Sequence, residues 1–235
     1  MKNNLNLVLV CFVLILFCNS MHANEIGKLE TAYEQLQLNP NNRICQQEFF
    51  NSFPDDWESF RYMFDYMIND NIKEGNYIPS NLYFESYEYI CTYFNLSSTI
   101  ALENFCEKTI NICINGYWDA DAISYFKMGV KAIFLDSLDC YSTCFCNIYS
   151  KHMLNIFCNT LSMYTDDNIL SFWKFYLDSA VGVKQNSDVY LLTSKVIESY
   201  PRLAQLLLRQ YEKMQQGDKL ISKTIHKKRC KSMQN

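Results

Sequence analysis

The stretch NGYWDADAI, Asn115–Ile123, decides the fold of this chain because it predicts where one helix ends and the next begins. Gly116 suits the left-handed position after a helix, and Asp119 is a strong N-cap for the helix that follows. With Asp119 as N-cap, Trp118 and Ile123 occupy positions where they can pack together as a hydrophobic staple. We therefore expect two antiparallel helices joined by a packing turn that carries no chemistry.

The pattern on both sides of this turn is also helical. Apolar residues recur at helical spacing, and the prolines fall where this spacing breaks. No stretch alternates apolar and polar residues for long enough to predict a strand. We expect helices over about 25–38, 41–53, 55–67, 82–93, 97–113, 119–133, 137–162 (whole or broken), 165–178, 188–199 and 201–216, with a polar loop over 69–81. The predicted fold is all-α, with nine or ten helices packed as antiparallel hairpins that could form an irregular α-solenoid.

Residues 1–23 have the pattern of a secretory signal peptide. Lys2 opens a short positive region, residues 7–17 are apolar, and a polar segment with small residues follows. Eleven apolar residues are too few to span a bilayer, and no later run reaches that length. Cleavage after Ser20 or after Ala23 both remain open, whereas Phe17 before Cys18 disfavours a lipoprotein. We expect a soluble periplasmic or secreted protein with no stable membrane insertion.

The cysteine count does not match a disulfide framework. Of the 11 cysteines, Cys11 and Cys18 leave with the signal peptide, and nine is an odd number. Most of the nine fall on apolar helix faces, where a free cysteine behaves as a small hydrophobe. We expect mainly buried thiols, with one or two bridges among Cys45, Cys91, Cys106, Cys113, Cys140, Cys144, Cys146, Cys158 and Cys230.

Charge divides the mature chain into an acidic body and a basic tail. Residues 24–216 hold 14 basic and 24 acidic residues, a net charge of −10, whereas residues 217–235 carry +5. An acidic body disfavours nucleic acid and anionic membranes as partners and would attract a basic protein. We therefore expect one helical domain over 25–216, a basic, flexible tail over 217–235, and a protein partner that could be a basic toxin.

Four residues within 140–152 superficially resemble a zinc site: Cys140, Cys144, Cys146 and His152. On a continuous helix, Cys146 points about 200° from Cys144, and His152 lies about 80° from Cys144, so the four cannot converge on one ion. A thiol nucleophile pairing Cys158 or Cys144 with His152 also lacks the sequence signature of catalytic cysteines. We therefore expect no metal and no cofactor.

Carboxylates near the central turn offer the remaining candidate for catalysis. Asp119 and Asp121 could face Glu103 and Glu107 of the preceding helix, but capping and a solvated helix face account for all four. The sequence has no Gly-rich phosphate loop, no GxSxG and no HExxH. We therefore expect a binding protein, with a metal-dependent or thiol enzyme as the opposing hypothesis.

Aromatic residues are the feature that fits binding. The chain has 17 Tyr, 16 Phe and 3 Trp, and some tyrosines fall between core positions. Tyrosine is favoured at interface centres because it brings contact area and a hydrogen bond at low entropic cost. Compositional bias explains the same counts equally well, and the candidates for exposure are Tyr62, Tyr66, Tyr87 and Tyr89.

Three strings together resemble a group of exported all-helical proteins that is common in Bacteroidetes. They are NPNN at 39–42 followed by QQEFFNSFPD at 46–55, NGYWDADAI at 115–123, and SFWKFYLD at 171–178, which includes Trp173 as a structural residue. The group usually continues the third string into a Gly-Pro-His-Pro-like turn, where this chain has Ser-Ala-Val-Gly at 179–182.

The resemblance covers nearly the whole mature chain and implies a helical, exported protein. Some members of the group are thought to be immunity proteins encoded beside interbacterial toxins, so an immunity role is what the resemblance implies. A cell-envelope scaffold or accessory protein is the alternative. The resemblance assigns no catalytic residue.

Overall fold

The computed structural model describes residues 24–68, 77–80, 82–117, 121–134, 145, 148, 150–178, 192 and 199–232. Over these residues the chain is all-α, as predicted, and contains nine α-helices. They are 24–38, α2 (Arg43–Ser52), α3 (Trp57–Phe64), α4 (Ser86–Asn95), α5 (Leu102–Cys113), α6 (Ala122–Phe134), α7 (Lys151–Ser162), α8 (Asp166–Leu177) and α10 (Pro201–Ser232), joined by a 3₁₀ turn, η1 (Leu96–Ser98), and two strands, β1 (Tyr66–Ile68) and β2 (Tyr77–Pro79).

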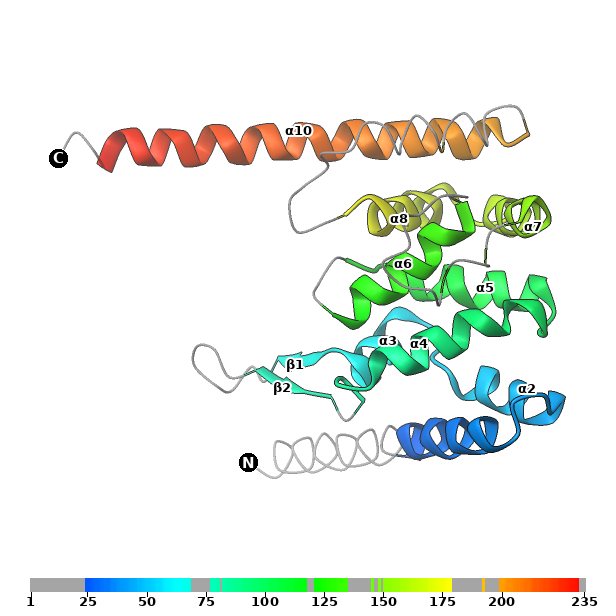
Figure 1. The fold of residues 1–235 in the computed structure, drawn as a ribbon. Coiled ribbons are helices and arrows are strands. Elements are labelled where there is room, and N and C mark those ends of the chain that lie inside the picture. The colour runs from blue at the N-terminus through cyan, green and yellow to red at the C-terminus, as the bar shows by residue number, and fades with distance from the viewer. Residues whose placement is uncertain are drawn as a thin grey trace, which may run out of the picture.

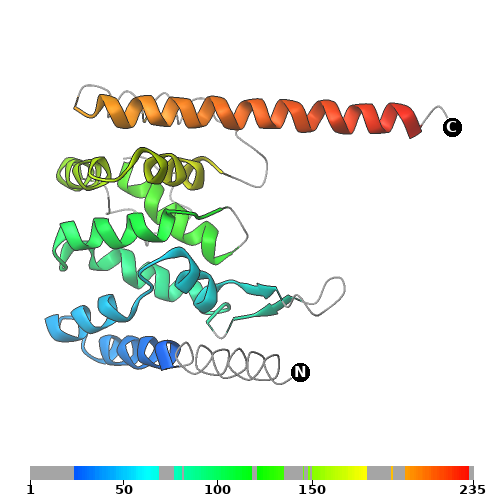
Figure 2. The same cartoon turned by 180° about the vertical axis from the view of Figure 1, so that it is seen from behind.

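The helices are stacked in chain order, from the segment 24–38 at one end to α10 at the other (Figure 1). Figure 2 shows the same order from behind. Contacts join five helices to a later one that is not the next helix in the chain: α3 packs on α5, α5 on α7, α4 on α6, α6 on α8, and α8 on α10. This is how successive helical hairpins pack, because each helix meets its counterpart in the next hairpin. The stack therefore has the form of an irregular α-solenoid.

Side-chain caps start four of the helices, and each is a local feature of the sequence. Asn42 accepts a hydrogen bond from the Ile44 N–H at 2.8 Å, and Asp56 accepts one from the Ser59 N–H at 2.8 Å. Ser150 and Thr165 cap α7 and α8 in the same way. These oxygens bond to N–H groups that have no partner within the helix, which is why the starts predicted at Asp56 and Thr165 are confirmed.

The segment after α3 differs from the prediction. Helix α3 ends at Phe64, and Asp65 is extended, so residues 66–68 form β1 instead of continuing the helix to Met67. β1 pairs antiparallel with β2, with Met67 opposite Ile78, so part of the predicted polar loop is a strand. A strand of three residues is too short to show an alternating pattern.

The turn after α5 also corrects the prediction. Asn115 takes the left-handed position with φ 65°, whereas Gly116 is not left-handed. A Cβ on Gly116 would lie 2.6 Å from Cδ2 of Phe175 and 2.9 Å from the carbonyl oxygen of Cys113. Gly116 is therefore required because α8 approaches closely, and asparagine tolerates the left-handed backbone.

Helix α6 begins later than expected. Its first residue is Ala122, and the Asp121 carbonyl accepts a hydrogen bond from the Tyr125 N–H at 3.0 Å, which joins Asp121 to the first turn. Ile123 is fully buried. Trp118 and Asp119 lie outside the described residues, so their staple and cap roles stay predictions.

One hydrophobic cluster extends from Ile26 to Tyr211. Aromatic rings dominate it: the Tyr93 ring stacks on Phe53 at 4.2 Å and on Phe105 at 5.1 Å between ring centroids. The Tyr93 hydroxyl is satisfied by Thr109 at 2.8 Å. Trp173 is fully buried, and its ring centroid lies 4.9 Å from that of Phe172. The aromatic content fills the core between layers.

Helix α10 is longer than predicted. It continues through Gly217 to Ser232, so the expected tail is helical in its backbone, and Figure 1 shows this end projecting past the body. At its start, Arg202 donates to the Ser162 and Tyr164 carbonyls at 2.9 and 3.0 Å and to Asp166 at 2.8 Å. Arg202 thus ties α10 to the connection between α7 and α8.

Candidate functional site

Of the residues proposed from sequence for a metal or thiol site, the structure describes His152 and Cys158 and does not place them at a common site. Cys140, Cys144 and Cys146 lie outside the described residues. His152 is exposed in the first turn of α7, whereas Cys158 on the same helix is fully buried. Across the described part of the chain, no group of three His, Cys, Asp or Glu side chains could hold a metal ion.

The described carboxylates near the central turn lie toward opposite ends of α5. Glu103 and Glu107 are exposed in the N-terminal half of α5, whereas Asp121 follows the C-terminal end of that helix. Asp119 lies outside the described residues. The hypothesis of a carboxylate pair at this turn has no support from the geometry.

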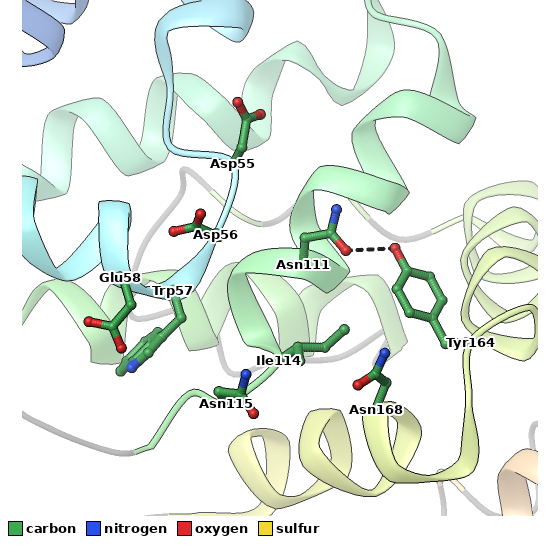
Figure 3. Close-up of a pocket in the computed structure, with 9 residues that line it drawn as sticks. All are labelled: Asp55, Asp56, Trp57, Glu58, Asn111, Ile114, Asn115, Tyr164 and Asn168. Atoms are coloured by element: carbon green, nitrogen blue, oxygen red, sulfur yellow. Dashed lines mark hydrogen bonds between the residues drawn. The ribbon is translucent and has the colours of Figure 1, made fainter. Parts of the chain in front are cut away.

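A cavity of about 570 Å³ among the described residues has a distinct chemistry (Figure 3). Three connections meet around it: the one before α3, the end of α5, and the one between α7 and α8. Its lining residues are Asp55, Asp56, Trp57, Glu58, Asn111, Ile114, Asn115, Tyr164 and Asn168. We call this the α3–α5–α8 cavity. Two smaller hollows of about 250 and 260 Å³ lie beside Pro54 and beside Ser97.

One wall of the cavity is acidic, and a buried lysine positions it. The Lys108 ammonium lies 2.6 Å from an Asp55 oxygen and donates to the Phe50 and Phe53 carbonyls at 2.8 and 2.7 Å. Burial lowers the pKa of Lys108, and the hydrogen bond to Asp55 opposes that shift. Because Lys108 contacts Asp55 and the carbonyls of Phe50 and Phe53, it stabilises the connection between α2 and α3 that carries Asp55.

The other two carboxylates of the wall belong to the start of α3. Asp56 is the N-cap, and Glu58 stands in the first turn, where the helix dipole favours a negative charge. Trp57 between them is buried, with its ring centroid 5.2 Å from Tyr117 and 5.7 Å from Phe175 in edge-to-face geometry. The indole Nε1 has no hydrogen-bond partner within the described part of the chain. Trp57 is thus an anchor for this wall.

The opposite wall carries amides and a phenol. Tyr164 donates a hydrogen bond to Asn111 Oδ1 at 2.7 Å, and Figure 3 shows this pair facing the acidic wall across the cavity. Burial, with a smaller contribution from Glu107, raises the pKa of Tyr164 to about 12, so its hydroxyl stays protonated. The Asn115 N–H donates to Ser171 Oγ at 2.8 Å, which anchors the floor of the cavity to α8.

The cavity is chemically suited to hold a cation that donates hydrogen bonds. Three carboxylates and three side-chain amides line it, together with one hydroxyl, and its nine lining residues include no His, Cys, Ser or Lys. A guanidinium or ammonium group could bond to both walls. This site could not be predicted from the sequence, because its residues come from three separate segments. The local pattern Asp-Asp-Trp-Glu at 55–58 is equally typical of a helix start.

The described cysteines are mostly inert. Cys45, Cys106, Cys113 and Cys158 are buried free thiols, as predicted. Burial raises the pKa of Cys106 and of Cys158 to about 12, so both remain protonated and are poor nucleophiles. Cys91 is disulfide-bonded, and its partner lies outside the described residues.

The tyrosines proposed for the surface are only partly exposed. Tyr62 and Tyr87 are half-buried against the core, and Tyr89 is buried, so the prediction was wrong for Tyr89. The side chain of Tyr66 is not among those described. Among the described side chains, the exposed large apolar ones are instead Leu38, Ile44, Phe84 and Met163.

The described helices include none with the length and apolar content needed to cross a membrane. Comparison with known proteins adds no identity: no protein-family model, no curated protein sequence and no solved structure matches this chain. The resemblance to exported Bacteroidetes proteins therefore stays a prediction, and the functional conclusion rests on the chemistry of the chain itself.

Proposed function

We propose that this chain is an exported binding protein without catalytic activity, and specifically a periplasmic immunity protein that neutralises an interbacterial toxin by stoichiometric contact. The observation that carries this proposal is the α3–α5–α8 cavity. Its walls offer carboxylates and amides for hydrogen bonding, and its lining residues include no His, Cys, Ser or Lys. Such a site favours recognition of a basic side chain on a partner.

The charge of the chain supports the same kind of partner. The body from 24 to 216 carries a net charge of −10, and the cavity wall contributes Asp55, Asp56 and Glu58 to it. A negative field of this kind speeds the encounter with a basic protein and repels nucleic acid. A rapid encounter is what a protein that intercepts a toxin needs.

The cysteines support export and argue against a thiol enzyme. A disulfide at Cys91 is typical of a protein that folds in an oxidising compartment such as the periplasm. The signal-like pattern at 1–23 predicts the same destination. The thiols of Cys106 and Cys158 are held protonated in the core, which disfavours their use as nucleophiles.

A protection assay tests this proposal. The open reading frame next to this gene is exported to the periplasm of a sensitive strain, with and without this protein. We expect killing by the neighbour alone and survival when both are present. A harmless neighbour, or equal killing in the two strains, would contradict the immunity role.

A charge reversal sharpens the assay at the cavity. Glu58→Lys places a like charge where a basic side chain of the toxin would bind, so protection should fall. The matched control is Glu212→Lys on α10, which makes the same charge change at an exposed position away from the cavity. Equal protection by both variants would show that the cavity is not the contact.

A cell-envelope scaffold is the second candidate, and the stacking of the hairpins favours it. Stacked helical hairpins present long surfaces that suit assembly of other proteins. This function predicts that the protein co-fractionates with the envelope and gives no protection against a neighbouring gene product. Recovery in the soluble periplasmic fraction alone would rule it out.

A further inference from the structure

We propose that the helix 24–38 and α4 together form a docking surface for a basic segment of a protein partner that also carries apolar side chains. We call this surface the glutamate face, and it consists of Glu30, Glu34, Leu38, Phe84, Glu85 and Glu88. The inference rests on the proposed function in one respect, namely that the activity of this chain is protein binding. It adds a second contact surface besides the α3–α5–α8 cavity and states what chemistry the partner must present there.

A stacked tyrosine pair holds the two helices of the glutamate face together. The rings of Tyr33 and Tyr89 lie 4.2 Å apart between centroids at an interplanar angle of 28°. Burial raises the pKa of both phenols. The charges of Glu88 and Glu85 add to this shift at Tyr33, and those of Glu85, Glu30 and Glu34 add to it at Tyr89. Glu30 and Glu34 lie within one turn of Tyr33, and Glu85 and Glu88 lie within about one turn of Tyr89, so the four exposed carboxylates flank the place where the two helices meet.

Two exposed apolar side chains border these carboxylates. Leu38 is 75% exposed and lies one helical turn beyond Glu34. Phe84 is 80% exposed and directly precedes Glu85, with its ring edge-to-face on Tyr83 at 5.2 Å. Large apolar side chains this exposed lose contact with water only when another molecule covers them. Beside a charged surface, that molecule must be amphipathic.

The charge of the face selects a basic protein segment as the occupant. Helix 24–38 contains one lysine, Lys28, against Glu25, Glu30 and Glu34, and residues 82–95 contain no lysine or arginine, so acidic side chains outnumber basic ones on these two segments. Glu30 and Glu34 are one turn apart on the same helix, a spacing at which like charges destabilise the helix. Lysine or arginine side chains of a partner would relieve this repulsion, whereas nucleic acid and anionic lipid would be repelled.

The direct test measures binding of a fluorescently labelled amphipathic peptide of lysine and leucine to the full mature chain by anisotropy. The test variant replaces Glu30, Glu34, Glu85 and Glu88 by Gln. The control variant makes the same change in charge at four exposed glutamates on other surfaces, Glu48, Glu103, Glu107 and Glu212. We expect the test variant to lose affinity by about tenfold and the control variant to bind like the native protein. Equal loss in both variants, or no loss in the test variant, would overturn the proposal.

A second pair of variants tests the apolar part and controls for folding. Leu38→Ser and Phe84→Ser replace side chains that are already exposed, so the circular dichroism spectrum and melting temperature should stay native while affinity falls severalfold. Unchanged affinity would remove these residues from the face. Binding of vesicles rich in phosphatidylglycerol, or equal binding of a matched glutamate and leucine peptide, would contradict a basic protein occupant.

This experiment is separable from the test of the immunity role. If the neighbouring gene is harmless but the peptide binds at the glutamate face, the docking surface stands and the identity of the partner is wrong. If the neighbour is neutralised but the glutamine variant protects fully and binds the peptide like the native protein, the immunity role stands and the docking surface is wrong.

Discussion

In two regions of this molecule a buried lysine donates hydrogen bonds to carbonyl groups at the end of another helix. The two lysines differ in the pKa of the ammonium group. Lys108 on α5 donates to the Phe50 and Phe53 carbonyls at the end of α2. Lys127 on α6 donates to the Asp178 carbonyl at the end of α8. Each ammonium also lies over an aromatic ring, 4.8 Å from the centroid of Phe50 for Lys108 and 5.3 Å from that of Phe175 for Lys127.

The difference is in the neighbouring charges. Lys108 has the Asp55 carboxylate at 2.6 Å, which opposes the lowering of its pKa by burial. Lys127 has Lys131 nearby, which adds to the effect of burial, so its pKa falls to about 7 although Asp178 opposes the shift. Both lysines therefore cap a helix end. Lys108 does so with a carboxylate partner, whereas Lys127, with a pKa of about 7, is about half protonated at pH 7. Neighbouring charge, and not burial alone, sets the charge state of a buried lysine.

Removal of Lys108 should have the largest effect. Lys108→Met leaves the Phe50 and Phe53 carbonyls without their donor and releases Asp55, so we expect the free energy of unfolding to fall by about 3 to 4 kcal/mol. Urea denaturation followed by circular dichroism measures this change. Lys213→Met, at an exposed position of α10, is the control and should change it little. A small effect at Lys108 would show that water replaces its contacts.

The pH dependence of stability should separate Lys127 from Lys108. In the unfolded chain Lys127 keeps a pKa near 10.4, so between about pH 7 and pH 10 the unfolded state binds the extra proton and stability rises with pH. Relative to Lys127→Met, the native protein should gain up to about 1.4 kcal/mol per pH unit from pH 7 to 9. Contributions of the other buried tyrosines and cysteines cancel in this difference, except that of Cys113, which interacts electrostatically with Lys127. A flat difference would mean that Lys127 stays charged.

Removal of the counter-charge should make Lys108 more like Lys127. Asp55→Asn deletes the group that opposes burial, so the pKa of Lys108 should fall further, as followed by NMR of its ammonium group. The Asp55 side chain is 76% exposed, so the loss of stability should be about 1 kcal/mol or less. An unchanged pKa would show that the two carbonyls alone hold the charge of Lys108.

The smallest change should come from Lys131. Lys131→Gln removes the like charge beside Lys127, so the pKa of Lys127 should rise above about 7. Lys131 is partly exposed, and we expect only a few tenths of a kcal/mol in stability. The two effects are read from NMR titration and urea denaturation. A pKa that does not move would assign the whole shift of Lys127 to burial.

The helices that could be predicted from sequence are those whose ends are set by local contacts. Asp56 and Thr165 bond to N–H groups three residues ahead, so the starts of α3 and α8 follow from short spacings. The strand at 66–68 could not be predicted in this way, because it depends on pairing with residues 77–79. The continuation of α10 beyond residue 216 was not predicted, because Gly217 was interpreted as a helix end. A single glycine weakens a helix without ending it.

The sequence by itself determined the all-α class, the acidic body and the main helix starts, because periodicity, charge and caps depend on neighbouring residues. Only the tertiary structure decided why Gly116 must lack a side chain, since the reason is the ring of Phe175 on another helix. It also decided the α3–α5–α8 cavity, where Asp55, Asn111 and Tyr164 meet from three connections. Contacts between segments far apart in the chain leave no spacing to read, so the chemistry of both proposed binding surfaces emerges only when the helices stack.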